Sequence, residues 1–389
     1  MKLFLVVLFA SVLLAECYRI LPKRLGGNRE KLAKLKHFIH SQKFQQSSKP
    51  QSLQSNVDIY GGGFYITNIT IGTPPQQFLV LLDTTSSDLL IPDITIDLPG
   101  YNLTKFNSSA SSTYQFIGNT TDYAGNGMLI GQDVVKLGGI GAQQITIPKT
   151  RFLQDSTVDF KDFYFGGISG ILGLAFESLA TTGGAPPLVN AINQGLLSQP
   201  IFTTYLIGKK NQTSSSSDFY PGGKITYGGL DPQNCGDVIA YQTLSSASYF
   251  QFTLSGISIG NYSNTKSYQT YIDVDFAIQG PSNLINAIAN ELGAKYTGSV
   301  SGGYYYSIDC NAKVPPLKLK IGSTTFSIDA KYLITAVNGY CVVNISILDN
   351  GGFGPSMILG QPFAQQYCTV FDLGNKRIGF APMKNGQGI

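Results

Sequence analysis

The stretch that decides the fold reads Phe78-Leu-Val-Leu-Leu-Asp-Thr-Thr-Ser-Ser-Asp-Leu-Leu-Ile-Pro92. An apolar run ends at Asp83, small hydroxyl residues follow, and a second apolar run ends at Pro92. This pattern favours a buried strand that delivers one carboxylate into a turn. Taken alone, the stretch is equally compatible with an ordinary β-turn that begins with an aspartate.

The same plan occurs twice along the chain. In the first half, 90 positions separate Asp83 from the glycine of Ile171-Leu-Gly173. In the second half, 87 positions separate Asp273 from the glycine of Ile358-Leu-Gly360. Matching spacing of Asp and Ile-Leu-Gly in both halves predicts an internally duplicated, two-lobed protein.

Further motifs surround this repeat. Upstream of Asp83, a strand-like alternating segment leads into the turn Gly72-Thr-Pro-Pro75, and Asp83 itself opens Asp-Thr-x-Ser-Ser. Together with the C-terminal run Tyr367-Cys-Thr-Val-Phe-Asp-Leu-Gly-Asn-Lys-Arg-Ile-Gly-Phe-Ala-Pro382, these motifs resemble the pepsin family of aspartic proteases. The resemblance covers about residues 57–389. The Cys positions and the run at 351–355 are most similar to secreted or lysosomal members from nematodes.

The resemblance implies a mostly β, bilobal pepsin-like fold, with two duplicated β-barrel-like lobes around a cleft and a few short helices. We expect the N-terminal lobe over residues 57–230 and the C-terminal lobe over 231–389. At 389 residues, the chain is long enough for each lobe to bury its own core. Composition agrees, because charged residues are only 13% while Gly (44), Tyr (22) and Phe (23) are plentiful, as suits short strands and turns.

The first residues indicate entry into the secretory pathway. An apolar run from Leu3 to Ala15 is too short for a membrane span and is typical of a signal peptide, here over residues 1–16. No later stretch is long and apolar enough to act as a membrane anchor. We therefore expect a secreted (extracellular) or lysosomal protein. Seven Asn-x-Ser/Thr sequons are compatible with that route: Asn68, Asn102, Asn107, Asn119, Asn211, Asn261 and Asn344.

Residues 17–56 form a basic, propeptide-like segment. Residues 18–50 hold nine Lys/Arg and a single Glu, whereas residues 51–389 carry 17 basic and 21 acidic residues. The family resemblance implies that this segment covers an acidic cleft until cleavage between Lys49 and Gly61; a permanent solvated tail is the alternative. Because the excess of basic residues is confined to this segment, we do not expect the body to bind nucleic acid.

Histidine is absent from the expected mature body. Both histidines, His37 and His40, lie in the basic segment. Their removal excludes Ser-His-Asp and Cys-His hydrolases and HExxH metalloproteases. No metal ion and no cofactor are expected, and carboxylates remain the natural candidates for acid–base work.

The chemistry implied by the resemblance needs two carboxylates that share one proton around a water molecule. Like charges at contact distance cannot both ionise cheaply, so one aspartate acts as base and the other as acid, as in pepsin. Active family members carry Asp-Thr/Ser-Gly in each half. The glycine lets backbone amides approach the carboxylate, and the hydroxyl residues after each aspartate brace the two loops. Asp83 and Asp273 are the counterparts in this chain.

The first motif departs from the family pattern at one position. Thr84 and Ser86 match it, but Thr85 replaces the glycine. A β-branched side chain at this position is expected to crowd the carboxylate or to twist the loop.

The second motif departs further. Val274 has no hydroxyl, and Asp275 replaces the glycine and adds a third carboxylate that would disturb the shared proton. The register of this motif is open by a residue or two. Counting back from Gly280-Pro281 without a gap puts Ile272, and not Asp273, at the catalytic position.

A β-hairpin with a polar, Gly-rich tip is expected over residues 119–139. In the family, such a hairpin covers the cleft and offers a tyrosine to the substrate. Tyr123 is the candidate for this role, although an ungapped alignment places Thr120 there.

Four cysteines remain once Cys17, beside the signal peptide, is set aside. In a secretory protein four cysteines allow three disulfide connectivities. A disulfide at the places of Cys310 and Cys341 is a feature of the family, and this pair leaves Cys235 to bond with Cys368.

These departures predict a pepsin-like aspartic endopeptidase homologue with weak or absent proteolysis, retained for peptide binding. One alternative is a functional acid endopeptidase that uses Asp83 and Asp273, and another is a structural secreted glycoprotein. The sequence thus leaves open whether the chain is an enzyme. We expect a monomer with a peptide or protein, as substrate or ligand, in its cleft.

Overall fold

The computed structural model describes residues 50–384 except for 61–62, 122–126, 157–166, 209–218, 301–302, 338 and 349–353. Residues Pro50–Ile389 form one unit by themselves. The expected signal peptide, the basic segment up to residue 49 and Tyr123 lie outside the described residues.

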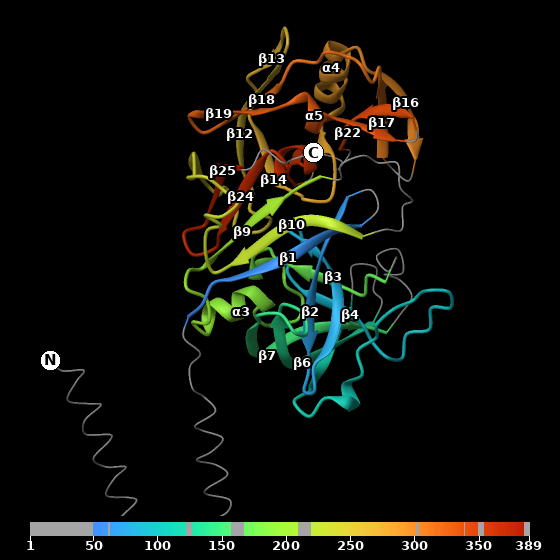
Figure 1. Ribbon diagram of the computed structural model, residues 1–389, viewed down its shortest axis with the longest axis vertical. Coiled ribbons are helices and arrows are strands. Elements are labelled where there is room, and N and C mark those ends of the chain that lie inside the picture. The colour runs from blue at the N-terminus through green and yellow to red at the C-terminus, as the bar shows by residue number, and fades with distance from the viewer. Residues whose placement is uncertain are drawn as a thin grey trace, which may run out of the picture. The chain divides into compact units, whose positions relative to one another are not determined.

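The largest sheet contains thirteen strands, most of them from the first half of the chain (Figure 1). Its strands follow the two-residue side-chain period, as in β1 (Leu53–Tyr60), where every second residue is buried. An additional pairing between β2 and β6 folds part of the sheet back on itself, as in a barrel. In spatial order the strands are β11 (Ala240–Thr243), β25 (Arg377–Pro382), β24 (Tyr367–Asp372), β9 (Ile201–Leu206), β10 (Phe219–Tyr227), β1, β2 (Phe64–Ile71), β3 (Gln76–Asp83), β8 (Ile171–Gly173), β4 (Leu89–Pro92), β7 (Ile145–Asp155), β6 (Gly127–Leu137) and β5 (Gln115–Thr121).

The second half of the chain forms two further sheets. One runs in the order β19 (Thr324–Ile328), β18 (Leu317–Ile321), β12 (Phe252–Ile259), β14 (Tyr268–Ile272), β23 (Met357–Leu359), β15 (Ile278–Gly280) and β22 (Ile345–Ile347). A short strand, β13 (Tyr262–Asn264), pairs with β12 beside this path. The other sheet runs in the order β16 (Lys295–Val300), β17 (Gly303–Ile308), β21 (Tyr340–Val343) and β20 (Ile334–Val337).

Helices are few and short among the described residues. The longest, α4 (Ser282–Leu292), buries one face that includes Leu284 and Ile288, and it ends at Gly293, whose φ of 71° suits glycine. No helix in the described part of the chain is long and apolar enough to cross a membrane. The expectation of a mostly β fold with a few short helices is confirmed. The remaining helices are η1 (Ser108–Ala110), η3 (Glu177–Leu179), α3 (Pro187–Asn193), α5 (Ala330–Leu333) and α6 (Gln361–Ala364).

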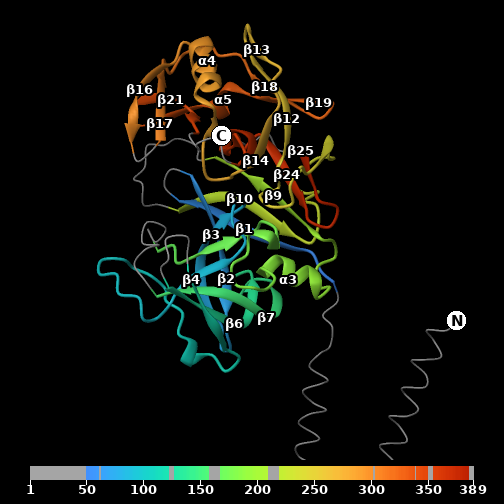
Figure 2. The ribbon, with the colours of Figure 1, turned by 180° about the vertical axis from the view of Figure 1, so that it is seen from behind.

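The end of the chain returns to the first half. Strand β24 pairs with β9, so that Val370 lies opposite Thr203. The ring of Phe371 stacks on that of Phe202 with centroids 4.4 Å apart. Figures 1 and 2 show β9 and β24 together, with β2, β6 and β7 on one side and β12, β18 and α4 on the other. The two halves therefore share a sheet and are not simply linked by a loop.

Among the described residues two disulfides are present, and they are the pairs expected from the sequence. Cys310 is bonded to Cys341, with 31 positions between them. Cys235 is bonded to Cys368 in β24, with 133 positions between them. The second disulfide ties the junction between the expected lobes to the C-terminal strands, and it closes a long loop that the unfolded chain would leave open.

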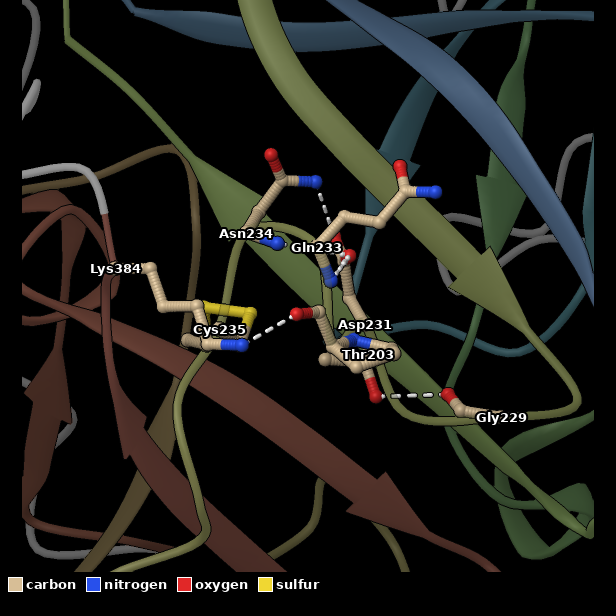
Figure 3. Close-up of a disulfide and its surroundings, with 9 residues drawn as sticks. Thr203, Gly229, Asp231, Gln233, Asn234, Cys235 and Lys384 are labelled. Carbon is tan, nitrogen blue, oxygen red and sulfur yellow. Dashed lines mark hydrogen bonds between the residues drawn. A yellow bond between two sulfur atoms is a disulfide. The ribbon is translucent and has the colours of Figure 1, made fainter.

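The residues before Cys235 form a fixed turn (Figure 3). The carboxylate of Asp231 accepts hydrogen bonds from the backbone N–H groups of Gln233 and Asn234, each at 3.2 Å. The N–H of Cys235 donates to the carbonyl of Asp231 at 2.9 Å. Because Asp231 is buried, these bonds also satisfy its charge, and the turn holds Cys235 in place for its partner.

Strand β1 begins before residue 57, where the N-terminal lobe was expected to start. It pairs with β10 from Leu53 onward and also with β2. The side chains of Leu53, Val57 and Ile59 are buried in the core. The polar residues that alternate with them give this stretch the composition of a linker.

This strand sets a limit on where the mature chain can begin. We expect a chain that starts at Gly61 to be less stable than one that starts at Pro50, because it loses three buried aliphatic side chains at about 1.5–3 kcal/mol each. It would also leave an edge of β10 without its partner. Urea unfolding of the two chains tests this expectation. Equal unfolding midpoints would contradict a structural role for β1.

Candidate active site

The backbone places Asp83 and Asp273 at equivalent positions. Strand β3 runs parallel to β8, with Asp83 opposite Gly173. Strand β14 runs parallel to β23 with Ile272 opposite Leu359, and the N–H of Asp273 donates to the carbonyl of Leu359 at 3.1 Å. In both halves the aspartate therefore lies at the end of its strand, level with the glycine of Ile-Leu-Gly in the neighbouring parallel strand. This register does not support the ungapped alignment, which placed Ile272 there.

The two glycines of the repeat are required by close packing. A Cβ atom on Gly173 would lie 2.4 Å from the backbone carbonyl carbon of Ser87, in the loop after the first aspartate. A Cβ atom on Gly360 would lie 1.9 Å from the carbonyl oxygen of Phe276, in the loop after the second. Only glycine allows the two loops to approach the parallel strand so closely, which explains the matched spacing seen in the sequence.

A hydrogen bond joins the loop after Asp83 to the strand that ends just before Asp273. The hydroxyl of Thr84 donates to the carbonyl of Ile272 at 2.8 Å, and the pair is buried. The equivalent residue in the second half is Val274, which is buried and has no hydroxyl. The brace is therefore made from one side only, as the sequence predicted.

The carboxylate of Asp83 accepts three hydrogen bonds from its own loop. Its Oδ1 accepts the backbone N–H of Thr85 at 2.7 Å and the hydroxyl of Thr85 at 2.6 Å. Its Oδ2 accepts the hydroxyl of Ser86 at 2.5 Å. Three donors at such short distances fix the orientation of this carboxylate.

Amide access survives in both loops despite the missing glycines. The N–H of Thr85 reaches Asp83, and the N–H of Asp275 donates to Oδ1 of Asp273 at 3.1 Å. The side chain of Thr85 does lie against the carboxylate, as expected, but it meets it through its hydroxyl. The alternative expectation, a loop twisted so that the amide is lost, does not hold.

Asp275 is held by residues from distant parts of the chain. Its Oδ1 accepts the N–H of Tyr65, in β2, at 3.1 Å. Its carbonyl accepts the side-chain N–H of Gln361, in α6, at 3.3 Å, and the same amide group donates to the carbonyl of Gly63. Asp275 therefore links the second loop to β2 of the other half.

The pKa values of the two aspartates in the second loop are raised. Burial raises the pKa of Asp273 to about 7, and the charge of Asp83 adds to the rise while the N–H of Asp275 opposes it. Burial also raises the pKa of Asp275 well above its usual value, with the charges of Asp273 and Asp83 adding to the effect and the N–H of Tyr65 opposing it. Some of the surface of Asp275 nevertheless remains exposed. Both groups hold protons that isolated aspartates would release.

A pair of tyrosines lies beside these carboxyl groups. Tyr271 lies on β14, two residues before Asp273, and interacts with the charge of that residue. Its ring is 5.4 Å from that of Tyr249. Burial, together with the charges of Asp273 and Asp83, raises the pKa of Tyr271, which therefore stays neutral. Nothing in the local sequence pattern pointed to this pair.

The described residues thus bring Asp83, Thr84, Thr85, Ser86, Asp273 and Asp275 together, whereas Tyr123 lies outside them. Within the same residues, no group of three or more His, Cys, Asp or Glu could hold a metal ion. The site consists of three carboxyl groups, two of them with raised pKa values, at the meeting point of two duplicated halves. Two aspartates brought together from duplicated halves are the arrangement of the aspartic protease class, and Asp275 is an addition to it.

Comparisons with known proteins identify the family. Residues 64–383 match the family described as eukaryotic aspartyl protease, and the chain belongs to this family. It is 43% identical over 337 residues to aspartic protease 6 of Caenorhabditis elegans, covering 85% of this chain and 84% of the relative. It is 30% identical over 402 residues to pepsin A of Rhinolophus ferrumequinum, covering 97% and 99%. It is 32% identical over 386 residues to the vacuolar aspartic protease of Candida albicans, covering 95% and 88%.

The raised pKa values make stability depend on pH. Because Asp273 binds its proton more tightly in the folded than in the unfolded chain, the stability it contributes is fully present below about pH 4 and is lost as pH rises through 7. A pKa raised from 3.8 to about 7 corresponds to at most about 4 kcal/mol. We expect Asp273→Asn to lose less stability between pH 4 and pH 7 than the unmodified protein.

Urea unfolding at the two pH values measures this difference, with Asp97→Asn as the control because Asp97 is exposed. The control should decline with pH as the unmodified protein does. An equal decline in all three proteins would contradict the protonation of Asp273 in the fold.

Proposed function

We propose that this chain is a pepsin-family homologue with weak or absent peptide-bond hydrolysis, and that its fold binds extended peptides. The observation that carries the proposal is that Oδ1 of Asp83 accepts both the N–H and the O–H of Thr85. An ionised carboxylate has about four lone-pair sites on its two oxygens. Thr85 therefore occupies both sites of Oδ1, and a water molecule would have to bind through Oδ2, which already accepts from Ser86.

A third carboxyl group adds to this deficiency. Catalysis in the family uses one proton shared between two aspartates, which requires that their pKa values be pushed apart. Here Asp273 and Asp275 both have raised pKa values, and both interact with the charge of Asp83. A third group that holds a proton therefore lies beside the catalytic pair, and the titration of the pair is coupled to it.

A functional acid endopeptidase that uses Asp83 and Asp273 is the competing proposal. Two observations favour it, namely the amide donation retained in both loops and the hydrogen bond from Thr84 to Ile272. A structural secreted glycoprotein without a peptide ligand is the third possibility. Hydrolysis and peptide binding, measured separately, distinguish the three.

Peptide binding is supported by the family and by the side chains around the aspartates. The family name implies peptide substrates for its members. Phe276, next to Asp275, is 50% exposed, and Tyr249 and Tyr271 lie near Asp273. Apolar and aromatic side chains around a few polar groups are what ligand sites in proteins offer.

We also propose a secreted or lysosomal location for the protein as a monomer. The two disulfides support passage through an oxidising compartment. One relative is named a vacuolar protease. On this view residues 1–16 are removed as a signal peptide, the basic segment is removed on maturation, and the lobes join near residue 230.

The catalytic deficiency can be tested by repair. The repaired protein carries Thr85→Gly, Val274→Thr, Asp275→Gly, Phe276→Thr and Ala277→Ser, which restore the family pattern in both loops. We expect it to cleave a denatured protein at pH 3–5 at least roughly a thousandfold faster than the unmodified mature protein, since one oriented donor contributes about 2.7–4 kcal/mol to catalysis.

Partial repairs serve as controls. Thr85→Gly alone, or the changes in the second loop alone, should give little activity, because the two carboxylates act as a unit. Adding Asp83→Asn to the repaired protein should abolish its activity. Efficient cleavage by the unmodified protein that Asp83→Asn abolishes would establish the competing proposal instead.

Peptide binding gives an independent prediction. A statine-type peptide, which mimics the tetrahedral intermediate, should bind the unmodified mature protein in calorimetry even though hydrolysis is weak. We expect binding to weaken with Phe276→Ser, which removes exposed apolar surface without altering a carboxyl group. An absence of binding at every pH between 3 and 7 would favour the structural glycoprotein.

A further inference from the structure

The sequons differ in the accessibility of the nitrogen that would carry a glycan. At Asn344 this nitrogen, Nδ2, donates to the carbonyl of Tyr332 at 3.1 Å and to the hydroxyl of Thr335 at 2.7 Å. A glycan on Nδ2 would break this arrangement, which joins α5 to the strands around it. We therefore expect Asn344 to carry no glycan, because its side-chain nitrogen is needed for these hydrogen bonds.

Other sequons present their asparagine to solvent. Asn119 lies in β5, opposite Leu129 of β6, and both Asn119 and the sequon hydroxyl residue Thr121 are exposed. Asn261 is exposed in the turn between β12 and β13. An exposed Asn-x-Ser/Thr on the surface of a secretory protein is an acceptor for N-linked glycosylation.

Among the described strands, β5 combines an edge position with a lack of charge and with exposed apolar side chains. It is the last strand in the order of the thirteen-stranded sheet, paired on one side with β6. Residues 115–121 include no Lys, Arg, Asp or Glu. Phe116 is 58% exposed and Ile117 is 38% exposed. An uncharged, partly apolar edge strand of this kind is a template for pairing with another chain.

Proteins protect such edges with charge, proline, bulges or a covering segment. Strand β5 has a register shift between Phe116 and Gly118, but its second part, which contains Asn119, pairs regularly with β6. In this regular part, Asn119 is exposed, and its side-chain amide can carry a bulky hydrophilic group.

We propose that Asn119 carries an N-linked glycan and that this glycan shields the open edge of β5 from association with a second copy of the chain. In the modification, Nδ2 of Asn119 loses a proton and forms a bond to the anomeric carbon of an activated oligosaccharide. The bond from that carbon to its pyrophosphate leaving group breaks. The proposal rests on the secretory location proposed above and does not depend on proteolytic activity.

Peptide mapping of the full chain, expressed in eukaryotic cells and collected after secretion, tests the modification. Enzymatic removal of glycans in heavy-oxygen water converts each occupied asparagine to a labelled aspartate. We expect the label at Asn119 and Asn261 and none at Asn344.

Paired variants separate the glycan from the side chain that bears it. Asn119→Gln and Thr121→Ala should each lose the mass of one glycan and should shift toward dimers and larger species in size-exclusion chromatography with light scattering. Thr121→Ser keeps the sequon and should behave as the unmodified protein. Asn261→Gln loses one glycan away from this edge and should remain a monomer.

Several results would overturn the proposal. An unlabelled Asn119 in a protein whose disulfides have formed would overturn the glycan alone. An unlabelled Asn119 together with reduced cysteines would overturn both the glycan and the secretory location. A monomeric Asn119→Gln variant, or association of Asn261→Gln to the same extent, would show that the glycan does not protect this edge.

Discussion

The hydrogen bond from the hydroxyl of Thr84 to the carbonyl of Ile272 is the contact on which the site depends. It fastens the loop that carries Asp83 to the strand that ends just before Asp273. Each loop lies close against a parallel strand, and only a glycine at the crossing point permits that approach. The positions of both aspartates therefore follow from this bond and from backbone packing, and they do not require a glycine at position 85 or 275. This explains how the geometry persists although both motifs have lost their glycine.

What changes is the electrostatic balance between the carboxyl groups. Thr85 adds a donor to Asp83, while burial raises the pKa values of Asp273 and Asp275. Asp275 also has a structural contact, because it accepts the N–H of Tyr65 from the other half. The replacements thus exchange the symmetric pair of the family for a set of three groups with fixed partners. A fold can keep its scaffold in this way while its chemistry is lost or altered.

Much of the fold and part of the site could be predicted from the sequence. The strand ending at Asp83 and the duplicated Ile-Leu-Gly elements have local periodicity and fixed spacing, and the structure shows both. The register at Asp273 could not be fixed, because it depends on pairing between β14 and β23, whose residues lie far apart in sequence. The contact between Tyr65 and Asp275 spans 210 positions and has no local signature. Strand β1 was not predicted from the sequence, because the polar residues at its exposed positions resemble those of a linker.

The claim that Thr85 saturates one oxygen of Asp83 can be tested most directly by neutron crystallography of the deuterated mature protein near pH 5. The account predicts two deuterons directed at Oδ1 of Asp83, one from the amide and one from the hydroxyl of Thr85, and deuterons on the carboxyl groups of Asp273 and Asp275. A water molecule bound to Oδ1 of Asp83 and shared with Asp273, with the hydroxyl of Thr85 turned away, would contradict it.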